Sequence, residues 1–202
     1  MTSRPKMLPS TKVNLEKLDV MLVDDNSQAL DILAQVVSGF GVRSIVRCAS
    51  GDEAKTKLLK GAYDLVLTDA QMPGLDGYEL ASWLRHSGPD QNRFVPVLLI
   101  TAHTRHSDVA RARDCGANYL IAKPVTPKTV LERIYWVARE DRMFVESDTY
   151  AGPDRRFRRE GPPPGMTGRR SGDLSAAVGH AETPNLSQDE IDSLMKPTKV
   201  SI

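Results

Sequence analysis

Residues 63–69 read YDLVLTD, an apolar run that ends on an aspartate. A short, continuous apolar run of this kind is typical of a strand that is buried on both faces of a parallel sheet. In open α/β sheets, ligands bind and chemistry occurs at the carboxyl ends of the strands. The sequence therefore predicts that Asp69 lies at the carboxyl edge of such a sheet, in a position to react.

Three further apolar runs also end on polar residues. Residues 18–23 (LDVMLV) precede Asp24 and Asp25, residues 95–100 (VPVLLI) precede Thr101, and residues 118–122 (NYLIA) precede Lys123 and Pro124. Because parallel strands end at the same edge of a sheet, we expect three acids, a hydroxyl and an amine to converge there.

This set of groups suits an aspartyl phosphate. Clustered carboxylates bind Mg²⁺, which neutralises the charge on a phosphoryl group that the third carboxylate, Asp69, attacks. Lys123 would place a positive charge on the phosphoryl oxygens, and Thr101 would donate a hydrogen bond. The segment Asp24-Asp25-Asn26 has a second interpretation, as a helix N-cap.

The segments between these runs have helical spacing of apolar residues. Helices are predicted at 28–38, 52–60, 78–85, 107–115 and from Thr126-Pro127 onward, with a further strand at 42–47 and a polar loop at 88–93. Strands that alternate with helices predict an α/β fold, a (βα)5 unit with a central five-stranded parallel sheet.

Five motifs carry a resemblance to a known family. They are VDDN at 23–26, LTDAQMPGLDG at 67–77, LITA at 99–102, GANY at 116–119 and KPVT at 123–126. Over residues 17–142 the chain resembles the CheY-like receiver domains of two-component response regulators, which have a flavodoxin-like fold and are signalling modules rather than enzymes.

The resemblance implies a role for each site residue. Asp69 would accept phosphate from a histidine kinase or a phosphotransfer protein. Asp24, Asp25, Asp69 and the backbone carbonyl of Gln71 would hold Mg²⁺. Thr101 and Lys123 would contact the phosphoryl group and couple it to a conformational switch.

One position departs from the family pattern. Leu120 stands where receivers usually carry a switching tyrosine or phenylalanine, and Tyr119, one residue earlier, should face the opposite side of its strand. We therefore expect a weakened response to phosphorylation, or a response to another signal.

Composition limits the remaining function classes. The 202 residues carry a net charge of +1, which argues against a nucleic-acid binder. The chain has two lone cysteines, Cys48 and Cys115, whose positions do not have the spacing of metal ligands. We find no leader segment, no apolar run of ~18–20 residues and no predicted helix-turn-helix after residue 142. The expectation is a cytoplasmic protein with reduced thiols that neither spans a membrane nor binds DNA.

The predicted organisation has five parts. They are a flexible N-terminus (1–16), the receiver (17–142), an Arg/Pro/Gly-rich tail (143–184), a short amphipathic helix (185–196) and a flexible end (197–202). Residues 151–173 contain six arginines, four prolines and five glycines, so most of the tail is predicted to be disordered when free.

The basic residues of the tail are all arginines, whose planar guanidinium groups grip phosphates and the O6/N7 edge of guanine. Two pairs, Arg155-Arg156 and Arg169-Arg170, lie with Asp173 in a pattern that resembles the tail of the Cle subgroup of CheY-like proteins. That resemblance implies binding of cyclic di-GMP and action on the flagellar motor. The open alternatives are a solvated linker, or a tail that binds nucleic acid, acidic lipid or acidic protein.

Residues 185–196 form the last predicted element. Ser187 and Glu190 can form a capping box, and Leu186, Ile191, Leu194 and Met195 line one side of the helix. The segment resembles the amino-terminal peptide of the flagellar switch protein FliM, which implies contacts with flagellar switch or chemotaxis proteins. It could occupy a receiver surface in cis, self-associate in trans or compete for another receiver; alternatively, it packs on its own domain as an ordinary last helix.

Two other functions stay open on the sequence alone. One is a phosphate sink or adaptor, a single-domain phospho-receiver whose tail binds no nucleotide. The other is a Mg²⁺-dependent phosphatase of the haloacid dehalogenase type, which carries a second aspartate two residues after its nucleophile. Gln71 occupies that position, which counts against a phosphatase.

Overall fold

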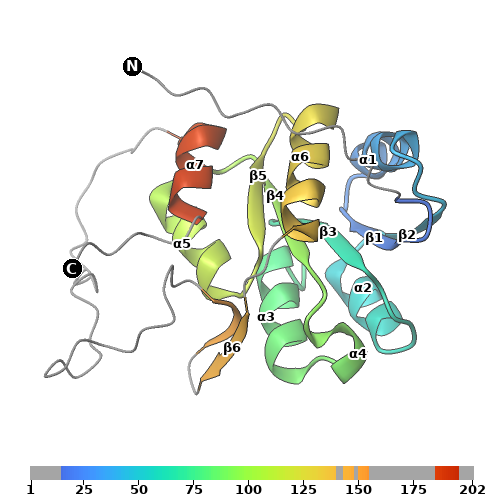
Figure 1. Cartoon of the computed structure of the whole chain (residues 1–202), viewed down its shortest axis with the longest axis horizontal. Coiled ribbons are helices and arrows are strands. Elements are labelled where there is room, and N and C mark those ends of the chain that lie inside the picture. Colours follow the sequence, from blue (N-terminus) through green and yellow to red (C-terminus); the bar gives the residue numbers. More distant parts are fainter. Residues whose placement is uncertain (1–14, 140–142, 148–149, 155–184, 196–202) are drawn as a thin grey trace, which may run out of the picture.

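A computed structural model describes residues 15–139, 143–147, 150–154 and 185–195 (Figure 1). Five parallel strands form one sheet in the order β2-β1-β3-β4-β5. Their bounds are β1 Asp19–Val23, β2 Ser44–Cys48, β3 Leu65–Asp69, β4 Val97–Thr101 and β5 Tyr119–Ala122. This order is that of the flavodoxin-like fold and confirms the predicted architecture.

Helices cover both faces of the sheet. Their bounds are α1 Ser27–Gly39, α2 Gly51–Leu58, α3 Gly77–Ser87, α4 Asp90–Arg93, α5 His106–Asp114, α6 Pro127–Ala138 and α7 Gln188–Met195. In Figure 1, α1 and α6 lie on one face, whereas α2 and α3 lie on the other. Right-handed crossovers between parallel strands produce this division.

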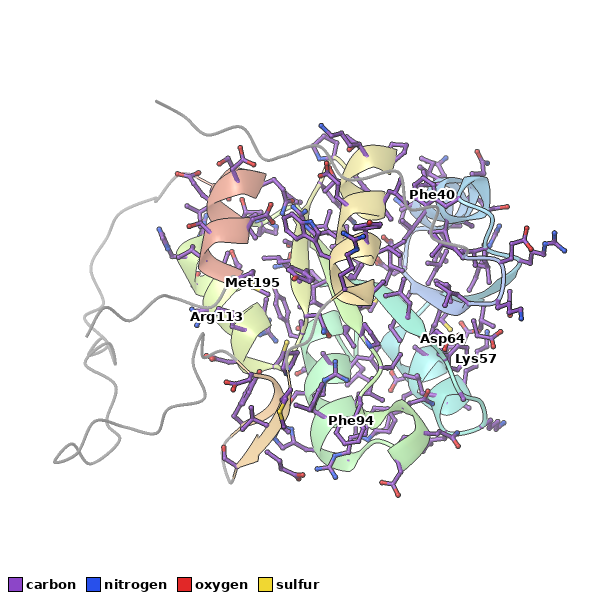
Figure 2. The ribbon with its side chains drawn as sticks, in the orientation of Figure 1. Phe40, Lys57, Asp64, Phe94, Arg113 and Met195 are labelled. Carbon is purple, nitrogen blue, oxygen red and sulfur yellow. The ribbon has the colours of Figure 1, made fainter. Side chains whose placement is uncertain are left out.

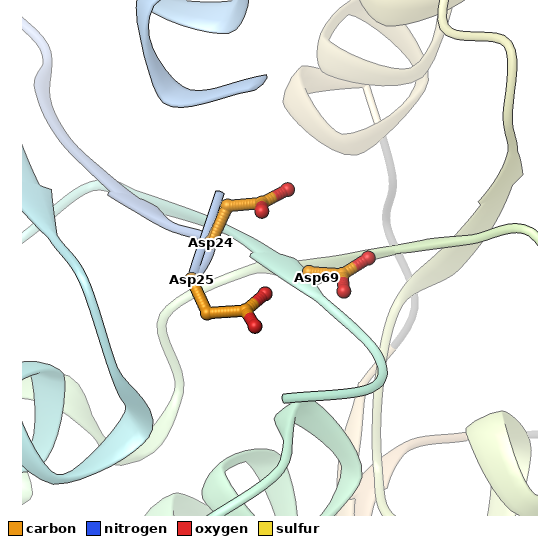
Figure 3. A group of neighbouring side chains, drawn as sticks. All are labelled: Asp24, Asp25 and Asp69. Atoms are coloured by element: carbon orange, nitrogen blue, oxygen red, sulfur yellow. The ribbon is translucent and has the colours of Figure 1, made fainter. Parts of the chain in front are cut away.

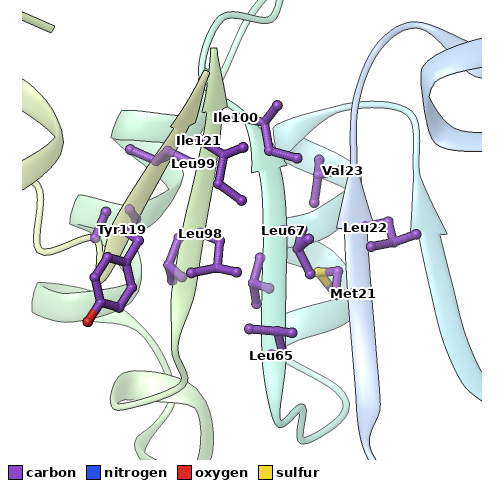
Figure 4. Close-up of a cluster of buried hydrophobic side chains, with 14 of the residues drawn as sticks. Met21, Leu22, Val23, Leu65, Leu67, Leu98, Leu99, Ile100, Tyr119 and Ile121 are labelled. Carbon is purple, nitrogen blue, oxygen red and sulfur yellow. The ribbon is translucent and has the colours of Figure 1, made fainter. Parts of the chain in front are cut away.

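The core lies in the three central strands. Met21, Leu22, Leu67, Leu98 and Leu99 are all fully buried, and Figure 4 shows them stacked across β1, β3 and β4. Because both faces of these strands are covered, successive residues are apolar, which is why the sequence shows runs rather than alternation.

The cap of α1 decides between the two interpretations of residues 24–26, as metal-binding acids or as a helix N-cap. Asn26 caps α1, since its side-chain oxygen accepts hydrogen bonds from the N–H groups of Gln28 and Ala29 at 2.9 and 3.2 Å. Asp24 and Asp25 are therefore not the N-cap of this helix, and their carboxylates remain available at the sheet edge. At α6, the predicted Thr126 cap and Pro127 start are confirmed.

An antiparallel hairpin follows the receiver and was not predicted. Its strands are β6, Phe144–Ser147, and β7, Tyr150–Pro153, so it reaches into the segment expected to be disordered. The hairpin packs closely on the domain: a Cβ at Gly116, whose φ is +82°, would lie 2.4 Å from the carbonyl oxygen of Ala151. The aromatic ring of Phe144 lies 4.9 Å from that of Phe94.

The last helix, α7, packs on the chain's own receiver. It contacts β5 and α5, and Met195 lies at its C-terminal end (Figure 2). The capping box is confirmed, because the Glu190 carboxylate accepts from the Ser187 N–H at 2.8 Å and the Glu190 N–H approaches the Ser187 hydroxyl at 3.4 Å. The placement of α7 agrees both with the cis alternative and with an ordinary last helix that packs on its own domain.

Several predicted segments lie outside the described residues. These are most of the N-terminal segment 1–16, the end 197–202 and the tail residues Arg155, Arg156, Arg169, Arg170 and Asp173. Within the described part of the chain, no helix is both long enough and apolar enough to cross a bilayer.

A single turn, α4, occupies the stretch predicted as a polar loop. Within this turn the Asn92 side chain is fully buried and makes three hydrogen bonds. The Asn92 side chain accepts from the Tyr63 N–H at 2.9 Å and donates to the carbonyls of Leu58 and Gly61 at 2.7 and 2.6 Å. One amide thus ties the segment after α2 to the segment before β4.

Asn92→Ala should lower the free energy of unfolding by about 2–3 kcal/mol, because it leaves buried backbone groups without partners. Chemical denaturation monitored by circular dichroism measures the change. The matched control is Gln91→Ala, since Gln91 is exposed and makes one longer bond to Gly61 at 3.3 Å. Equal losses in the two variants would contradict this account of Asn92.

Candidate functional site

Three carboxylates meet at the carboxyl edge of the sheet. Asp24 and Asp25 follow β1, and Asp69 is the last residue of β3, its neighbour in the sheet. One carboxylate oxygen from each lies within 4.8 Å of the others (Figure 3). Asp24 and Asp69 are buried, whereas Asp25 is exposed and opens the cluster to solvent.

Lys123 is the cation of this cluster. Its Nζ lies 2.8 Å from Oδ1 of Asp69 and 3.4 Å from Oδ2 of Asp24. The backbone holds Lys123 in place, because its N–H donates to the carbonyl of Thr101 at 2.7 Å. The structure thus joins the ends of β1, β3, β4 and β5, as the sequence pattern indicated.

The electrostatics of the cluster favour added positive charge. Burial raises the pKa of Asp69, Lys123 partly offsets the effect, and the charges of Asp24 and Asp25 raise that pKa further. Burial alone would lower the pKa of Lys123, but its hydrogen bond to Asp69 and the nearby carboxylates raise it. The ammonium group of Lys123 contacts two of the three carboxylates, Asp69 and Asp24, and a further cation would stabilise the charged form of the site.

The residues present fit Mg²⁺. This ion prefers oxygen ligands, keeps several waters and is usually bound through a few carboxylates. Asp24, Asp25 and Asp69 supply such oxygens on one side, and the exposed position of Asp25 leaves room for water. Gln71 is exposed in the loop after β3, and the role of its backbone carbonyl stays a prediction.

The motif that follows Asp69 has a glycine at position 77 for a steric reason. A Cβ at this position would lie 2.1 Å from the carbonyl oxygen of Asp69. The N–H of Gly77 donates to the carbonyl of Ala70 at 3.2 Å, so α3 begins directly against the end of β3. A glycine is needed here because only a residue without a side chain permits this approach.

Thr101, at the end of β4, is held by its own loop. Its hydroxyl donates to the carbonyl of His103 at 3.1 Å and accepts from the His103 N–H at 3.0 Å. Thr101 is buried, and the same loop continues to Thr104 and the start of α5. Contact between Thr101 and a phosphoryl group stays a prediction.

Leu120 and Tyr119, where the sequence departs from the family pattern, are both buried in the core. Leu120 is fully buried and lies opposite Leu99 in the pairing of β4 and β5. The Tyr119 ring is 5.6 Å from the Trp136 ring of α6, so its aromatic contact is with that helix. An aliphatic side chain therefore occupies the position of the usual switching aromatic residue.

Sequence analysis overlooked Tyr78, which it treated as an ordinary residue of α3. The ring is buried under the Arg111 guanidinium, 4.2 Å from the ring centroid. Burial raises the pKa of Tyr78 to about 12, and the Thr101 hydroxyl is one of the neighbouring groups that act on it. Tyr78 thus places a buried phenol beside the loop of Thr101, but no signal in its helical spacing distinguishes it from a core residue.

The comparisons agree with this geometry. The family model described as the response regulator receiver domain matches residues 20–135. The chain belongs to this family. It is therefore the receiver domain of a two-component response regulator, with additional residues after the receiver.

Individual relatives cover the same part of the chain. The chemotaxis protein CheY-3 of Vibrio cholerae is 30% identical over 119 residues, which is 59% of this chain and 90% of the relative. The polar-differentiation response regulator DivK of Brucella anthropi is 31% identical over 115 residues, or 57% and 91% of the two chains. The crystallised CheY4 of Vibrio cholerae superposes with a TM-score of 0.55 at 27% identity, covering 59% of this chain and 98% of that one.

Mg²⁺ at 100 times its dissociation constant should raise the free energy of unfolding by about 2.7 kcal/mol, because the ion binds the folded cluster and not the unfolded chain. Urea denaturation with and without Mg²⁺ measures this gain. Asp25→Asn should remove most of it, since the variant loses one of three carboxylates. Asp90→Asn, an exposed aspartate of α4, is the control and should retain the gain; the same gain in both variants would exclude this cluster as the site.

Proposed function

We propose that Asp69 is the phosphoacceptor of this receiver. The observation that carries the proposal is the ion pair of 2.8 Å between Lys123 and Asp69, beside the carboxylates of Asp24 and Asp25. An aspartate that ends a buried strand and already has a fixed ammonium partner is prepared for the charge that a phosphoryl group brings.

In this reaction a carboxylate oxygen of Asp69 attacks the phosphorus of the donor. A P–O bond forms to Asp69, and the bond between phosphorus and the donor nitrogen or oxygen breaks, so that an acyl phosphate results. Lys123 then exchanges its contact with Asp69 for one with a phosphoryl oxygen, and the Thr101 hydroxyl leaves the His103 carbonyl to donate to another. Mg²⁺ supplies neutralisation of the added negative charge when it is bound.

The partners and the output are proposed from the family and from sequence resemblances. The phosphoryl donor is a histidine kinase or a phosphotransfer protein in the cytoplasm, and the output is a protein contact that modulates the flagellar motor or chemotaxis. Support comes from the relatives that are named chemotaxis proteins and from the similarity of residues 185–196 to the FliM peptide.

A second ligand is proposed for the tail. Arg155, Arg156, Arg169, Arg170 and Asp173 bind cyclic di-GMP, with the guanidinium groups on its phosphates and guanine edges. The sequence resemblance to the Cle subgroup supports this assignment.

One observation favours a variant of the main proposal. Leu120, fully buried in β5, cannot form the aromatic relay that usually reports phosphorylation at the output surface. A phosphate sink, which accepts phosphate without an output of its own, is the consequent alternative. Unchanged contacts with partners on phosphorylation would favour it.

Asp69→Asn should abolish labelling by radioactive acetyl phosphate in the presence of Mg²⁺, because the amide cannot form the acyl phosphate. Intact-mass spectrometry provides a second readout, the addition of one phosphoryl group to the wild type. Asp90→Asn is the matched control and should label fully. Wild-type stoichiometry in Asp69→Asn would overturn the assignment.

Arg169→Ala combined with Arg170→Ala should weaken binding of cyclic di-GMP at least about tenfold, since bidentate contacts to phosphate or guanine are lost. Isothermal titration of the full-length chain measures the affinity. Arg105→Ala, an exposed arginine that directly precedes α5, is the control for the loss of a positive charge. The absence of binding heat in the wild type would reduce the tail to a linker and leave the role of Asp69 unaffected.

A further inference from the structure

One buried hydroxyl near the carboxylate cluster has no hydrogen-bond partner. Tyr78 is the second residue of α3 and is 2% exposed. Its phenol oxygen is buried and makes no hydrogen bond with any of the described residues. Because a buried hydroxyl without a partner destabilises a folded protein, its presence in the core requires an explanation.

The position of the Tyr78 ring is fixed from two directions. At the backbone, Gly77 lies directly against the carbonyl oxygen of Asp69, which ties the start of α3 to the end of β3. At the ring face, the Arg111 guanidinium lies 4.2 Å from the ring centroid, and its Nη2 is 2.8 Å from Oδ2 of Asp76, the N-cap of α3. The phenol is therefore held in a set place relative to Asp69.

Thr101 supplies the neighbouring hydroxyl. Burial raises the pKa of Tyr78, and the Thr101 side chain is among the nearby groups that lower it, so the two hydroxyls are neighbours without forming a hydrogen bond. The Thr101 hydroxyl instead donates to the His103 carbonyl at 3.1 Å and accepts from the His103 N–H at 3.0 Å. The first of these bonds is long, since O–H···O bonds are usually about 2.7–2.8 Å.

The single proton of Thr101 limits the partners that it can take. A threonine hydroxyl has one proton and two lone pairs, and a phosphoryl oxygen only accepts hydrogen bonds. If Asp69 is phosphorylated, as proposed, Thr101 has to turn its proton from His103 to the phosphoryl group. Its lone pairs can then accept from a donor, and Tyr78 is such a donor, because a pKa of about 12 keeps the phenol protonated at neutral pH.

We propose that Tyr78 is a positioning residue for phosphorylation, whose hydroxyl donates to Oγ1 of Thr101 while Thr101 donates to a phosphoryl oxygen on Asp69. The phenol that has no partner in the unphosphorylated receiver gains one in the phosphorylated receiver, so the bond stabilises that state alone. A hydroxyl that accepts a hydrogen bond is also a stronger donor. The inference rests on the assignment of Asp69 as phosphoacceptor and adds a residue that directly follows the motif at 67–77.

Tyr78→Phe removes the hydroxyl and keeps the ring. The unphosphorylated receiver loses no hydrogen bond, so its urea midpoint should not fall. Binding of beryllofluoride with Mg²⁺, a mimic of the phosphoryl group, should weaken about fivefold, which is the effect of one ordinary hydrogen bond. Urea denaturation at increasing beryllofluoride concentration measures this affinity, because a ligand of the folded state raises the midpoint.

Tyr135 provides a matched control on α6, which covers the other face of the sheet (Figure 1). It is also buried, its hydroxyl also has no partner among the described residues, and the Arg139 guanidinium lies 4.3 Å from its ring centroid. Tyr135→Phe should leave both the urea midpoint and the affinity for beryllofluoride unchanged. Equal affinities of the Tyr78→Phe and Tyr135→Phe variants would overturn the proposal.

Variants of Thr101 show whether Tyr78 acts through this residue. Thr101→Val keeps the shape of the side chain without its hydroxyl, so Tyr78→Phe should cause no further loss of affinity in that background. In Thr101→Ser, which retains the hydroxyl, the loss of about fivefold should be present. The same loss in the valine background would mean that Tyr78 acts through packing, and would overturn the proposal.

Carbon-13 labelling of tyrosine Cζ detects the hydrogen bond in the wild-type protein. The chain has five tyrosines, and the two phenylalanine variants assign the resonances of Tyr78 and Tyr135. Beryllofluoride with Mg²⁺ should shift the Tyr78 resonance, because its hydroxyl becomes a donor, and should leave that of Tyr135 in place. In Thr101→Val the shift should be absent. A Tyr78 resonance that does not move in the wild type would contradict the proposed bond.

Labelling of Asp69 by acetyl phosphate separates this proposal from the one on which it rests. A wild type that is not labelled and does not bind beryllofluoride would overturn both proposals. A wild type that is labelled, and whose affinity for beryllofluoride Tyr78→Phe leaves unchanged, would remove the role of Tyr78 alone.

Discussion

The repulsion among three carboxylates at one sheet edge is the constraint on which the receiver depends. Asp24 and Asp69 are buried, and without Lys123 their charges would be unpaired in a medium of low dielectric. The packing of β1, β3 and β5 is what holds these groups together against their repulsion. The apolar core thus stabilises a cluster of carboxylates whose charged form each added positive charge would favour.

The same short segments that form this site also hold α7. Lys123, which contacts Asp69, directly follows Ala122, whose N–H is bonded to Gln188. Thr101 lies three residues before Thr104, which is bonded to Leu186. No long chain of contacts separates Asp69 from α7, because Ala122 and Lys123 are neighbours at the end of β5 and Thr104 lies three residues after Thr101, the end of β4.

The sequence predicts what local rules determine and misses what tertiary contacts decide. Strands that end on acids, the Asn26 and Ser187 caps and the apolar side of α7 follow from spacing and residue type. From the sequence, Asp192 looks like another exposed acid of an acidic helix. In the structure it is buried because it pairs with Arg133 of α6. Arg85 is fully buried for a similar reason, since the carbonyls of Arg93 and Gly116 accept from its guanidinium. The hairpin of β6 and β7 was missed because its stability comes from contact with Gly116 and Phe94 rather than from its own short strands.

Because the two sites share these segments, phosphorylation of Asp69 and the binding of α7 would affect each other in both directions. If Asp69 carries a phosphoryl group, as proposed, Lys123 and Thr101 would turn toward it; Ala122 and Thr104, which bond α7, lie one and three residues from them. By linkage, any effect of phosphorylation on the binding of α7 would be matched by an equal effect of α7 on the phosphorylation equilibrium. The side chain of Leu120 is not part of this route, because the hydrogen bonds to α7 come from the backbone of β5 and from Thr104. Transmission by this receiver, which lacks the usual aromatic residue, would therefore have to run through those two backbone segments.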